Sequence, residues 1–207
     1  MDKRAKDYIK RSRDFKVTRT RDDDGNPIIE GYFVVFDGIY EIGPGMTESV
    51  DRGAFDDTLG DDIRILVDHD TRLVLGRTTA GTAEIGADDK GVWARVQINP
   101  KDSDAMNTHA RVERGDVSQG SFGFEILEEN ADFRDDGSVH WTITKVRLFE
   151  LSVVTFPAYE DTDVSARTAQ REEIMRKRKS EKHEAWKNTM LQKLTGGKTN
   201  GTQSTDA

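Results

Sequence analysis

The sequence has no cysteine, only four prolines and 8% aromatic residues among its 207 positions. Without a thiol, the chain can form no disulfide, no thiolate metal site and no cysteine nucleophile. It also lacks an apolar run near the roughly 18 residues that a membrane-spanning helix needs, and its N-terminus lacks the apolar core of a signal peptide. These absences predict a soluble protein that works where it is made, with no membrane partner.

Charge is abundant but unevenly distributed. Hydrophobic and charged residues each make up 34% of the chain, and the net charge is −8. From Ser165 to the end, ten Lys/Arg stand against five Asp/Glu, whereas the first 164 residues carry 21 basic and 34 acidic side chains. Nucleic-acid binding needs clustered cations that contact phosphates. The acidic body therefore argues against a nucleic-acid partner.

The segment composition predicts a core-forming middle with polar ends. Four parts are predicted: a charged, partly helical arm (1–16), a β-rich domain (17–165), a charged helical tail (166–194) and a disordered end (195–207). In the tail, Trp186, Met190 and Leu194 recur every four residues and form a thin apolar stripe. Such a stripe cannot fold alone, so we expect the tail to pack against the β-rich domain or a partner.

Short runs of β-branched and aromatic residues, separated by turn-forming residues, predict a mostly β domain of the α+β class. The predicted strands are 17–21, 28–36, 63–70, 73–78, 82–85, 92–98, 119–126, 139–145 and 147–156. A loop is predicted over 41–51, one or two helical turns over 52–59, and a helix over 102–114 that Gly115 caps. Many short strands with regular turns favour a closed or nearly closed β-barrel, or a sandwich.

The stretch Gln119–Ile126 suggests chemistry. With a period of two, one face is apolar and the other polar. The apolar face holds Phe122, Phe124 and Ile126, and the polar face holds Ser121, Gly123 and Glu125. Ser121 thus stands on a rigid strand with open space beside it, where a substrate backbone can approach. It is a candidate nucleophile; an ordinary solvent-facing serine is the alternative.

Two further predicted strands place a polar side chain among apolar ones. His69 continues the apolar face of its strand, between two aspartates that point away, and Glu150 shares a face with Ser152, Val154 and Phe156. A serine nucleophile needs a base within hydrogen-bond reach, and a histidine oriented by a carboxylate can serve. His69, Ser121 and Glu150 are therefore a candidate catalytic set.

Each member has a structural alternative. His69 is equally consistent with a hydrogen-bonded core histidine, and Glu150 with an edge carboxylate paired to Arg147 or Lys145. Ser152 competes as a nucleophile, but its large neighbours favour a structural role.

The other histidines are interpreted as surface residues, because none has a companion at metal-ligand spacing; they are His109, His140 and His183. The glycine pairs do not form a phosphate loop with its lysine. We therefore expect neither a metal nor a cofactor.

Several short motifs follow one another in an order that resembles the prohead maturation proteases of tailed bacteriophages. They are Gly31–Phe36, Glu48 with Gly53–Phe55, Val67–Asp70 with Gly76, Asp89–Val92, Ser121–Phe124 and Glu150–Ala158. The resemblance covers about residues 31–166. It departs before Gly53, where Asp51-Arg52 replaces the more usual proline.

This resemblance implies a β-barrel with flanking helices, similar to the herpesvirus assembly proteases. It implies Ser121 as nucleophile, His69 as general base and acid, and Glu150 as the residue that orients the histidine. The expected substrates are the scaffold or the scaffold-like arm of the major capsid protein, and the chain itself, inside the procapsid in the host cytoplasm. Assembly as a homo-oligomer is compatible with this function. The alternative is a catalytically idle internal scaffold or assembly factor.

Overall fold

The computed structural model describes residues 9–14, 16–36, 38–156 and 161–195, with side chains for 18–36, 38–156 and 168–194. The chain divides into two compact units, residues 1–164 and residues 165–207, which are described separately. The predicted disordered end lies outside the described residues from position 196 onward.

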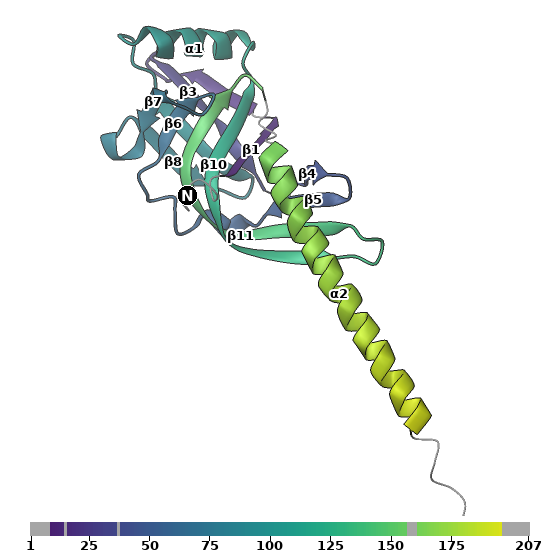
Figure 1. The fold of residues 1–207 in the computed structure, drawn as a ribbon. Helices are drawn as coiled ribbons and strands as arrows, with labels where there is room; N and C mark the ends of the chain where they lie inside the picture. Colours follow the sequence, from purple (N-terminus) through teal and green to yellow (C-terminus); the bar gives the residue numbers. More distant parts are fainter. Residues whose placement is uncertain (1–8, 15, 37, 157–160, 196–207) are drawn as a thin grey trace, which may run out of the picture. The chain divides into compact units, whose positions relative to one another are not determined.

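The first unit contains two β-sheets (Figure 1). The seven-stranded sheet consists of β1 (Ile9–Asp14), β4 (Tyr40–Gly43), β5 (Met46–Val50), β6 (Arg64–Val67), β7 (Asp70–Arg77), β10 (Gln119–Phe133) and β11 (Val139–Val154). The four-stranded sheet consists of β2 (Lys16–Arg21), β3 (Pro27–Val35), β8 (Ala83–Ala87) and β9 (Gly91–Gln97). Short 3-10 helices cover Arg52–Phe55 and Thr78–Ala80. A mostly β, α+β fold was predicted and is confirmed.

The predicted closed barrel is not found. Among the described strands, no ladder of hydrogen bonds joins a strand of one sheet to a strand of the other. The sheets meet through packing instead: a Cβ added to Gly76 on β7 would lie 2.4 Å from Cγ2 of Val96 on β9. At this corner a side chain packs against bare backbone, which brings the sheets together without the edge-to-edge pairing that closes a barrel.

The core lies between the inner faces of the two sheets. Phe55, Phe122 and Phe124 are fully buried within it, and the rings of Phe122 and Phe124 stack with centroids 4.7 Å apart. Burial of such rings is a large favourable term in folding. The predicted apolar face of the Ser121 strand therefore anchors that strand in the core.

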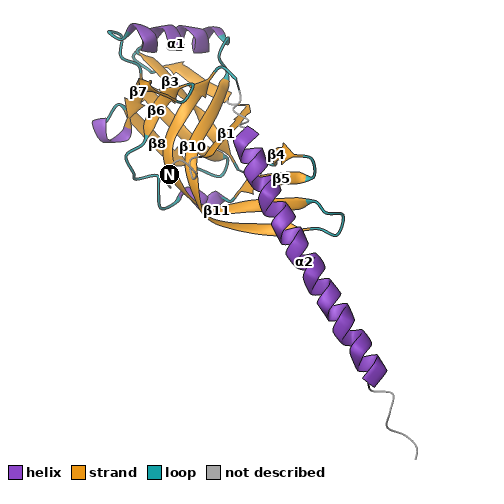
Figure 2. Cartoon of the chain, in the orientation of Figure 1, coloured by secondary structure: helices purple, strands orange, loops and turns teal. Residues whose placement is uncertain are grey.

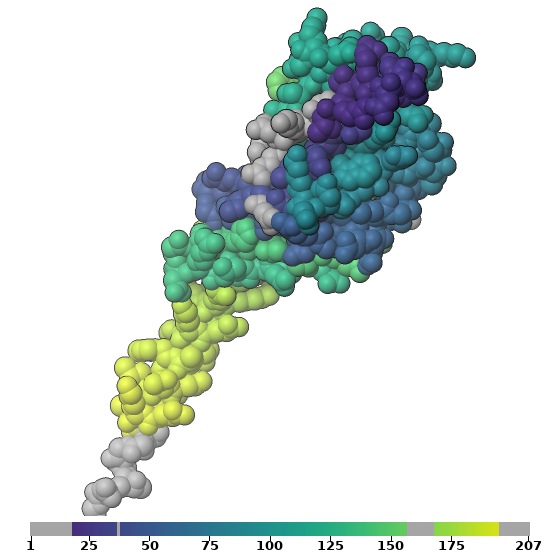
Figure 3. All heavy atoms as spheres, turned by 180° about the vertical axis from the view of Figure 1, so that it is seen from behind, coloured from purple at the N-terminus to yellow at the C-terminus, as the bar shows by residue number. Residues whose placement is uncertain are grey.

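Helix α1 (Ser103–Arg114) lies at one end of this unit, where the side chain of Asp102 caps its first turn and Gly115 its last. Arg21 at the end of β2 binds Glu113 of the helix at 3.0 Å, and Figure 3 shows these segments side by side. His109 was predicted at the surface, but it is buried and its Nε2 lies 2.7 Å from the carbonyl oxygen of Thr20. The prediction was wrong because the helix presents this face to β2 and not to water.

The predicted loop over 41–51 is also wrong, because β4 and β5 form a hairpin there. Gly43 and Gly45 suggested an irregular loop, but they only frame the turn of this hairpin. The strands predicted at 139–145 and 147–156 form one continuous strand, β11, which pairs along its length with β10. Figure 2 shows the far part of this pair extending beside β4 and β5, where a second core contains Ile42, Met46, Val139 and Trp141.

Residues 9–14 were predicted to belong to a partly helical arm, but they form β1, which pairs antiparallel with β10. The mixed charges of this segment suit a strand at a sheet edge as well as a helix, so the composition alone did not distinguish them.

The second unit contains helix α2, whose full span is Asp161–Thr195. Its described side chains are mostly exposed, including Trp186, Met190 and Leu194 of the predicted stripe. Among the described residues, no helix is both long enough and apolar enough to cross a membrane.

Candidate active site

His69 lies in the tight turn that joins β6 to β7. Val67 pairs with Asp70, so Asp68 and His69 are the two residues of the turn, and their φ angles are 49° and 59°. Two consecutive left-handed residues are the geometry of a type I′ hairpin turn, and each costs about 1–3 kcal/mol when it is not glycine. The sequence pattern placed His69 on the apolar face of a strand; the structure corrects this, because the strand ends at Val67.

The C-terminal end of β11 holds this strained turn. The backbone N–H of Asp68 donates to the carbonyl of Val153 at 2.9 Å. The Asp68 carboxylate accepts from the backbone N–H of Thr155 at 2.7 Å and from the Thr155 hydroxyl at 3.0 Å. The backbone N–H of His69 donates to Ser152 Oγ at 3.2 Å. A strained backbone conformation persists only where the surrounding structure holds it in place, and these four hydrogen bonds hold the Asp68–His69 turn.

Glu150 on β11 binds the imidazole. His69 Nδ1 lies 2.6 Å from Glu150 Oε1, and the two side chains are only 7% and 5% exposed. An ionised carboxylate can only accept hydrogen bonds, so Nδ1 of His69 is the donor in this contact. In the neutral imidazole, Nε2 is then the nitrogen that can accept a proton. The alternative partners of Glu150 are engaged elsewhere: Arg147 with Glu125 and Lys145 with Asp57.

Ser152 lies at the other side of the carboxylate. Its hydroxyl donates to Glu150 Oε2 at 2.5 Å, and the residue is fully buried. The proton of Ser152 is therefore directed at the carboxylate and away from the imidazole.

Ser121 stands directly opposite Ser152 in the β10–β11 ladder. Residues opposite one another in an antiparallel pair point to the same side of the sheet, so Ser121 shares a face with Ser152 and Glu150. Gly123 stands opposite Glu150 and has no side chain to compete for the space beside the carboxylate. The predicted polar face of this strand is thus the face that carries the candidate site.

Ser121 and His69 are not hydrogen-bonded in this structure. Nε2 of His69 is buried and has no hydrogen-bond partner within the described part of the chain. Ser121 is itself fully buried, so the predicted open approach beside it is wrong for this structure, as is the alternative of a solvent-facing serine. The structure therefore brings His69 and Glu150 into direct contact and places Ser121 on the neighbouring strand. The hydrogen bond between Ser121 and His69 Nε2 that a catalytic triad needs is not formed.

β1 covers the edge of β10 beside Ser121. In the register of this pair, Ser12 of β1 stands opposite Ser121, and Arg13 opposite Gly120. The edge of the strand that carries the serine is therefore already paired within the chain.

The features remote from this site carry no comparable chemistry. His140 is held by Thr47 and Ser49, each at 2.9 Å, and so serves as a link between β11 and β5. No group of three or more His, Asp or Glu side chains could hold a metal ion among the residues that the structure describes.

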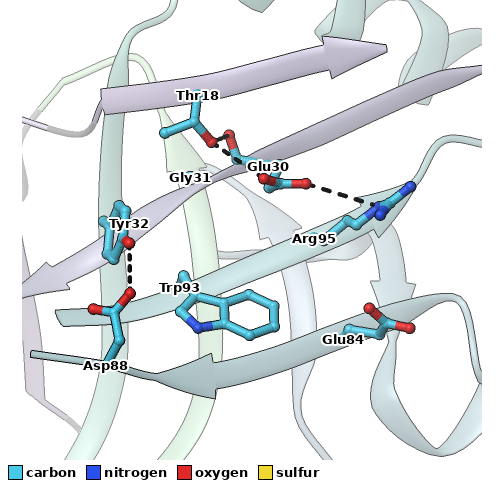
Figure 4. A pocket seen from close by; sticks show the side chains of 8 residues that line it. All are labelled: Thr18, Glu30, Gly31, Tyr32, Glu84, Asp88, Trp93 and Arg95. Carbon is cyan, nitrogen blue, oxygen red and sulfur yellow. Dashed lines mark hydrogen bonds and ion pairs between the residues drawn. The ribbon is translucent and has the colours of Figure 1, made fainter. Parts of the chain in front are cut away.

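A hollow of about 380 Å³ opens on the four-stranded sheet (Figure 4). Its polar groups largely bind one another: the Tyr32 hydroxyl donates to Asp88 at 2.6 Å, and Arg95 lies 3.9 Å from Glu30. The Tyr32 hydrogen bond lowers the pKa of Asp88 below its ordinary value, so this carboxyl is held ionised and is a poor proton donor. The Thr18 hydroxyl also lines the hollow and donates to the backbone carbonyl of Glu30 at 3.1 Å, with the Glu30 carboxylate 3.5 Å away.

Sequence reasoning missed the groups that hold His69 in place: the Asp68 carboxylate, Thr155, and Ser152, which was given a structural role without a partner. A usable signal existed. Asp and His are among the few non-glycine residues that tolerate positive φ, and here they stand next to each other between two apolar runs. That pattern indicates a two-residue turn rather than the continuation of a strand.

Comparison with known proteins adds an independent observation. Residues 14–177 match the family described as caudovirus prohead serine protease. The chain is 29% identical over 143 residues to the prohead protease of Enterobacteria phage HK97, a match that covers 67% of this chain and 59% of that protein. Its fold overlaps with the bacteriophage T4 capsid assembly protease gp21 at a TM-score of 0.43 and 8% identity, over 72% of this chain and 97% of that one.

Proposed function

Because the chain belongs to the caudovirus prohead serine protease family, we propose that it is a serine endopeptidase that cleaves capsid assembly proteins during procapsid maturation, with Ser121, His69 and Glu150 as its catalytic residues. The observation that carries the assignment of residues is the buried contact of 2.6 Å between His69 Nδ1 and Glu150 Oε1. It leaves Nε2 as the proton acceptor on the face of the sheet where Ser121 stands.

In the proposed reaction, Ser121 Oγ attacks the carbonyl carbon of the scissile peptide bond. His69 Nε2 takes the hydroxyl proton and then gives it to the leaving amine, so that the C–N bond breaks and an acyl-enzyme forms. Water then attacks the ester, giving one proton to His69, which returns it to Ser121 Oγ. Glu150 stabilises the imidazolium in both steps, and the burial of the pair strengthens this interaction.

The reaction requires Ser121 and His69 Nε2 to approach within hydrogen-bond distance. Catalytic hydrogen bonds often tighten only when substrate is bound. The closed site is therefore a resting arrangement in this proposal, and substrate binding would complete the link.

The proposed substrates are the scaffold, or the scaffold-like arm of the major capsid protein, and the chain itself, inside the procapsid in the host cytoplasm. The name of the HK97 relative, a prohead protease, supports this substrate class. The segment that follows residue 164 is a suitable place for self-cleavage, because it forms a separate unit with mostly exposed side chains.

The test is co-expression of the full chain with the major capsid protein and scaffold, followed by mass spectrometry of the protein termini. Ser121→Ala should abolish processing, whereas Ser49→Ala, which removes a hydroxyl bound to His140 far along β11, should leave it intact. Undiminished cleavage by Ser121→Ala would overturn the proposal.

A second candidate function is an internal scaffold without catalysis. It is favoured by α2, whose exposed Trp186, Met190 and Leu194 lie on a helix rich in lysine and arginine. A serine-reactive phosphonate distinguishes the two functions: labelling of Ser121 in the wild type but not in His69→Ala identifies the enzyme, and labelling of neither identifies the scaffold.

A further inference from the structure

We propose that Ser152 is a positioning residue of the catalytic site: a single buried hydroxyl fixes both the backbone of His69 and the carboxylate of Glu150, and so sets the direction in which the imidazole points. This inference rests on the proposed function.

Ser152 Oγ is hydrogen-bonded to both members of the His69–Glu150 pair. It donates to Glu150 Oε2 at 2.5 Å and accepts from the backbone N–H of His69 at 3.2 Å. The residue is fully buried, so water does not replace either bond at the surface. One oxygen is therefore joined to both members of the His69–Glu150 pair, in addition to their own contact of 2.6 Å.

His69 needs a link to β11 because it lies in a strained turn. His69 is held at a φ of 59°, in a region that residues other than glycine rarely adopt. Glu150 belongs to a rigid strand, whereas His69 belongs to a turn. A bond from β11 to the backbone of the turn prevents the imidazole from drifting, and a displacement of about 1 Å at such a site can lower a rate on the order of 100-fold.

The other charged groups in and beside the turn are engaged elsewhere. The Asp68 carboxylate binds Thr155 and the Asp70 carboxylate binds Arg72, whose guanidinium lowers the pKa of Asp70 to about 2. Arg64, which pairs with Glu150 in register, places its guanidinium 3.0 Å from Asp62. Of the groups named here, Ser152 is the one that donates to Oε2 of Glu150.

The same geometry argues against Ser152 as the nucleophile. The Ser152 hydroxyl already donates a hydrogen bond to Glu150, and its oxygen already accepts one from the backbone N–H of His69. Attack of this oxygen on a carbonyl carbon would break both hydrogen bonds. Ser121 lies directly across the ladder from Ser152, and it is not hydrogen-bonded to Nε2 of His69.

The experiment measures the second-order rate constant for labelling by a fluorophosphonate as a function of pH, with the labelled residue mapped by mass spectrometry and the stability of each variant measured in urea. Ser152→Ala should lower the rate by about 10- to 100-fold. It should also move the acid limb of the profile to higher pH by about one unit, because a carboxylate that loses a donor holds the shared proton of the pair more tightly. Ser152→Thr, which keeps a hydroxyl, should retain the wild-type profile.

The matched control is Ser49→Ala, which removes a hydroxyl hydrogen-bonded to a different histidine; its labelling rate should stay within about twofold of the wild type. If Ser152→Ala neither lowers the rate nor moves the acid limb to higher pH, or if it lowers the urea midpoint far more than Ser49→Ala does, the hydroxyl serves the fold and the proposal is overturned. Labelling mapped to Ser152 itself would also overturn it. Wild-type protein that reacts no faster than Ser121→Ala would instead refute the proposed function.

Discussion

Replacing Phe122 with alanine tests whether the strand of the candidate nucleophile is anchored by the core as described. Phe122 is fully buried, with its ring centroid 4.7 Å from that of Phe124 and 6.0 Å from that of Phe55. Truncation of a buried phenylalanine costs about 3–5 kcal/mol, of which each lost ring pair contributes about 0.5–1.5 kcal/mol. Domains of this kind are stable by about 5–15 kcal/mol. Phe122→Ala should therefore leave the protein folded but close to its threshold.

The assay is equilibrium unfolding in urea, followed by circular dichroism. With a slope of about 2 kcal/mol/M, a loss of about 4 kcal/mol lowers the midpoint by about 2 M. Phe149→Ala is the matched control, because this ring lies on the adjacent strand but is 37% exposed, and it should cost about 1 kcal/mol or less. Equal midpoints for the two variants would refute the reasoning that the apolar face of β10 anchors Ser121.

Three other predictions follow from the same structure. Glu150→Gln should keep the hydrogen bond to His69 but lose the charge that stabilises the imidazolium, so kcat should fall by about 10³- to 10⁴-fold in a peptide-cleavage assay. Hydrogen bonding from Arg77 lowers the pKa of Asp62, so this pair stabilises the fold at neutral pH and loses that effect progressively as the pH falls below about 4. The difference between the urea midpoints of wild type and Asp62→Asn should therefore be largest at pH 7 and shrink between about pH 4 and pH 2; a constant difference would contradict this. Asp102→Ala removes the cap of α1 and should cost about 1 kcal/mol, again measured in urea.

Periodicity predicted those parts of the molecule where local pattern and burial agree. The alternation around Ser121 predicted which side chains enter the core, because β10 is buried on that face by Phe55 and the other core residues. The C-terminal cap of α1 was predicted as well, since Gly115 acts through the backbone next to it; Asp102, which caps the first turn, was predicted only as the first residue of the helix.

The failures lie where the contacts come from distant parts of the chain. Nothing local shows that Thr155 binds Asp68 across 87 positions, so the end of β6 and the turn at His69 were read as one strand. The prediction of a closed barrel was wrong for a related reason. Whether two sheet edges form hydrogen bonds or only pack depends on contacts such as that of Gly76 with Val96, and the residue pattern of either strand alone does not show such a contact.

The pairing of β1 with β10 has a practical consequence for anyone who wishes to observe the protein at work. Because the chain has no cysteine, a single substitution such as Ser12→Cys would carry the sole thiol in the molecule, at the register position opposite Ser121. A spin label or fluorophore attached there would report on the pairing of β1 with β10, the strand that carries Ser121. The edge of the sheet thereby offers a position for a spectroscopic reporter that tests whether β1 stays paired with β10 when substrate is added.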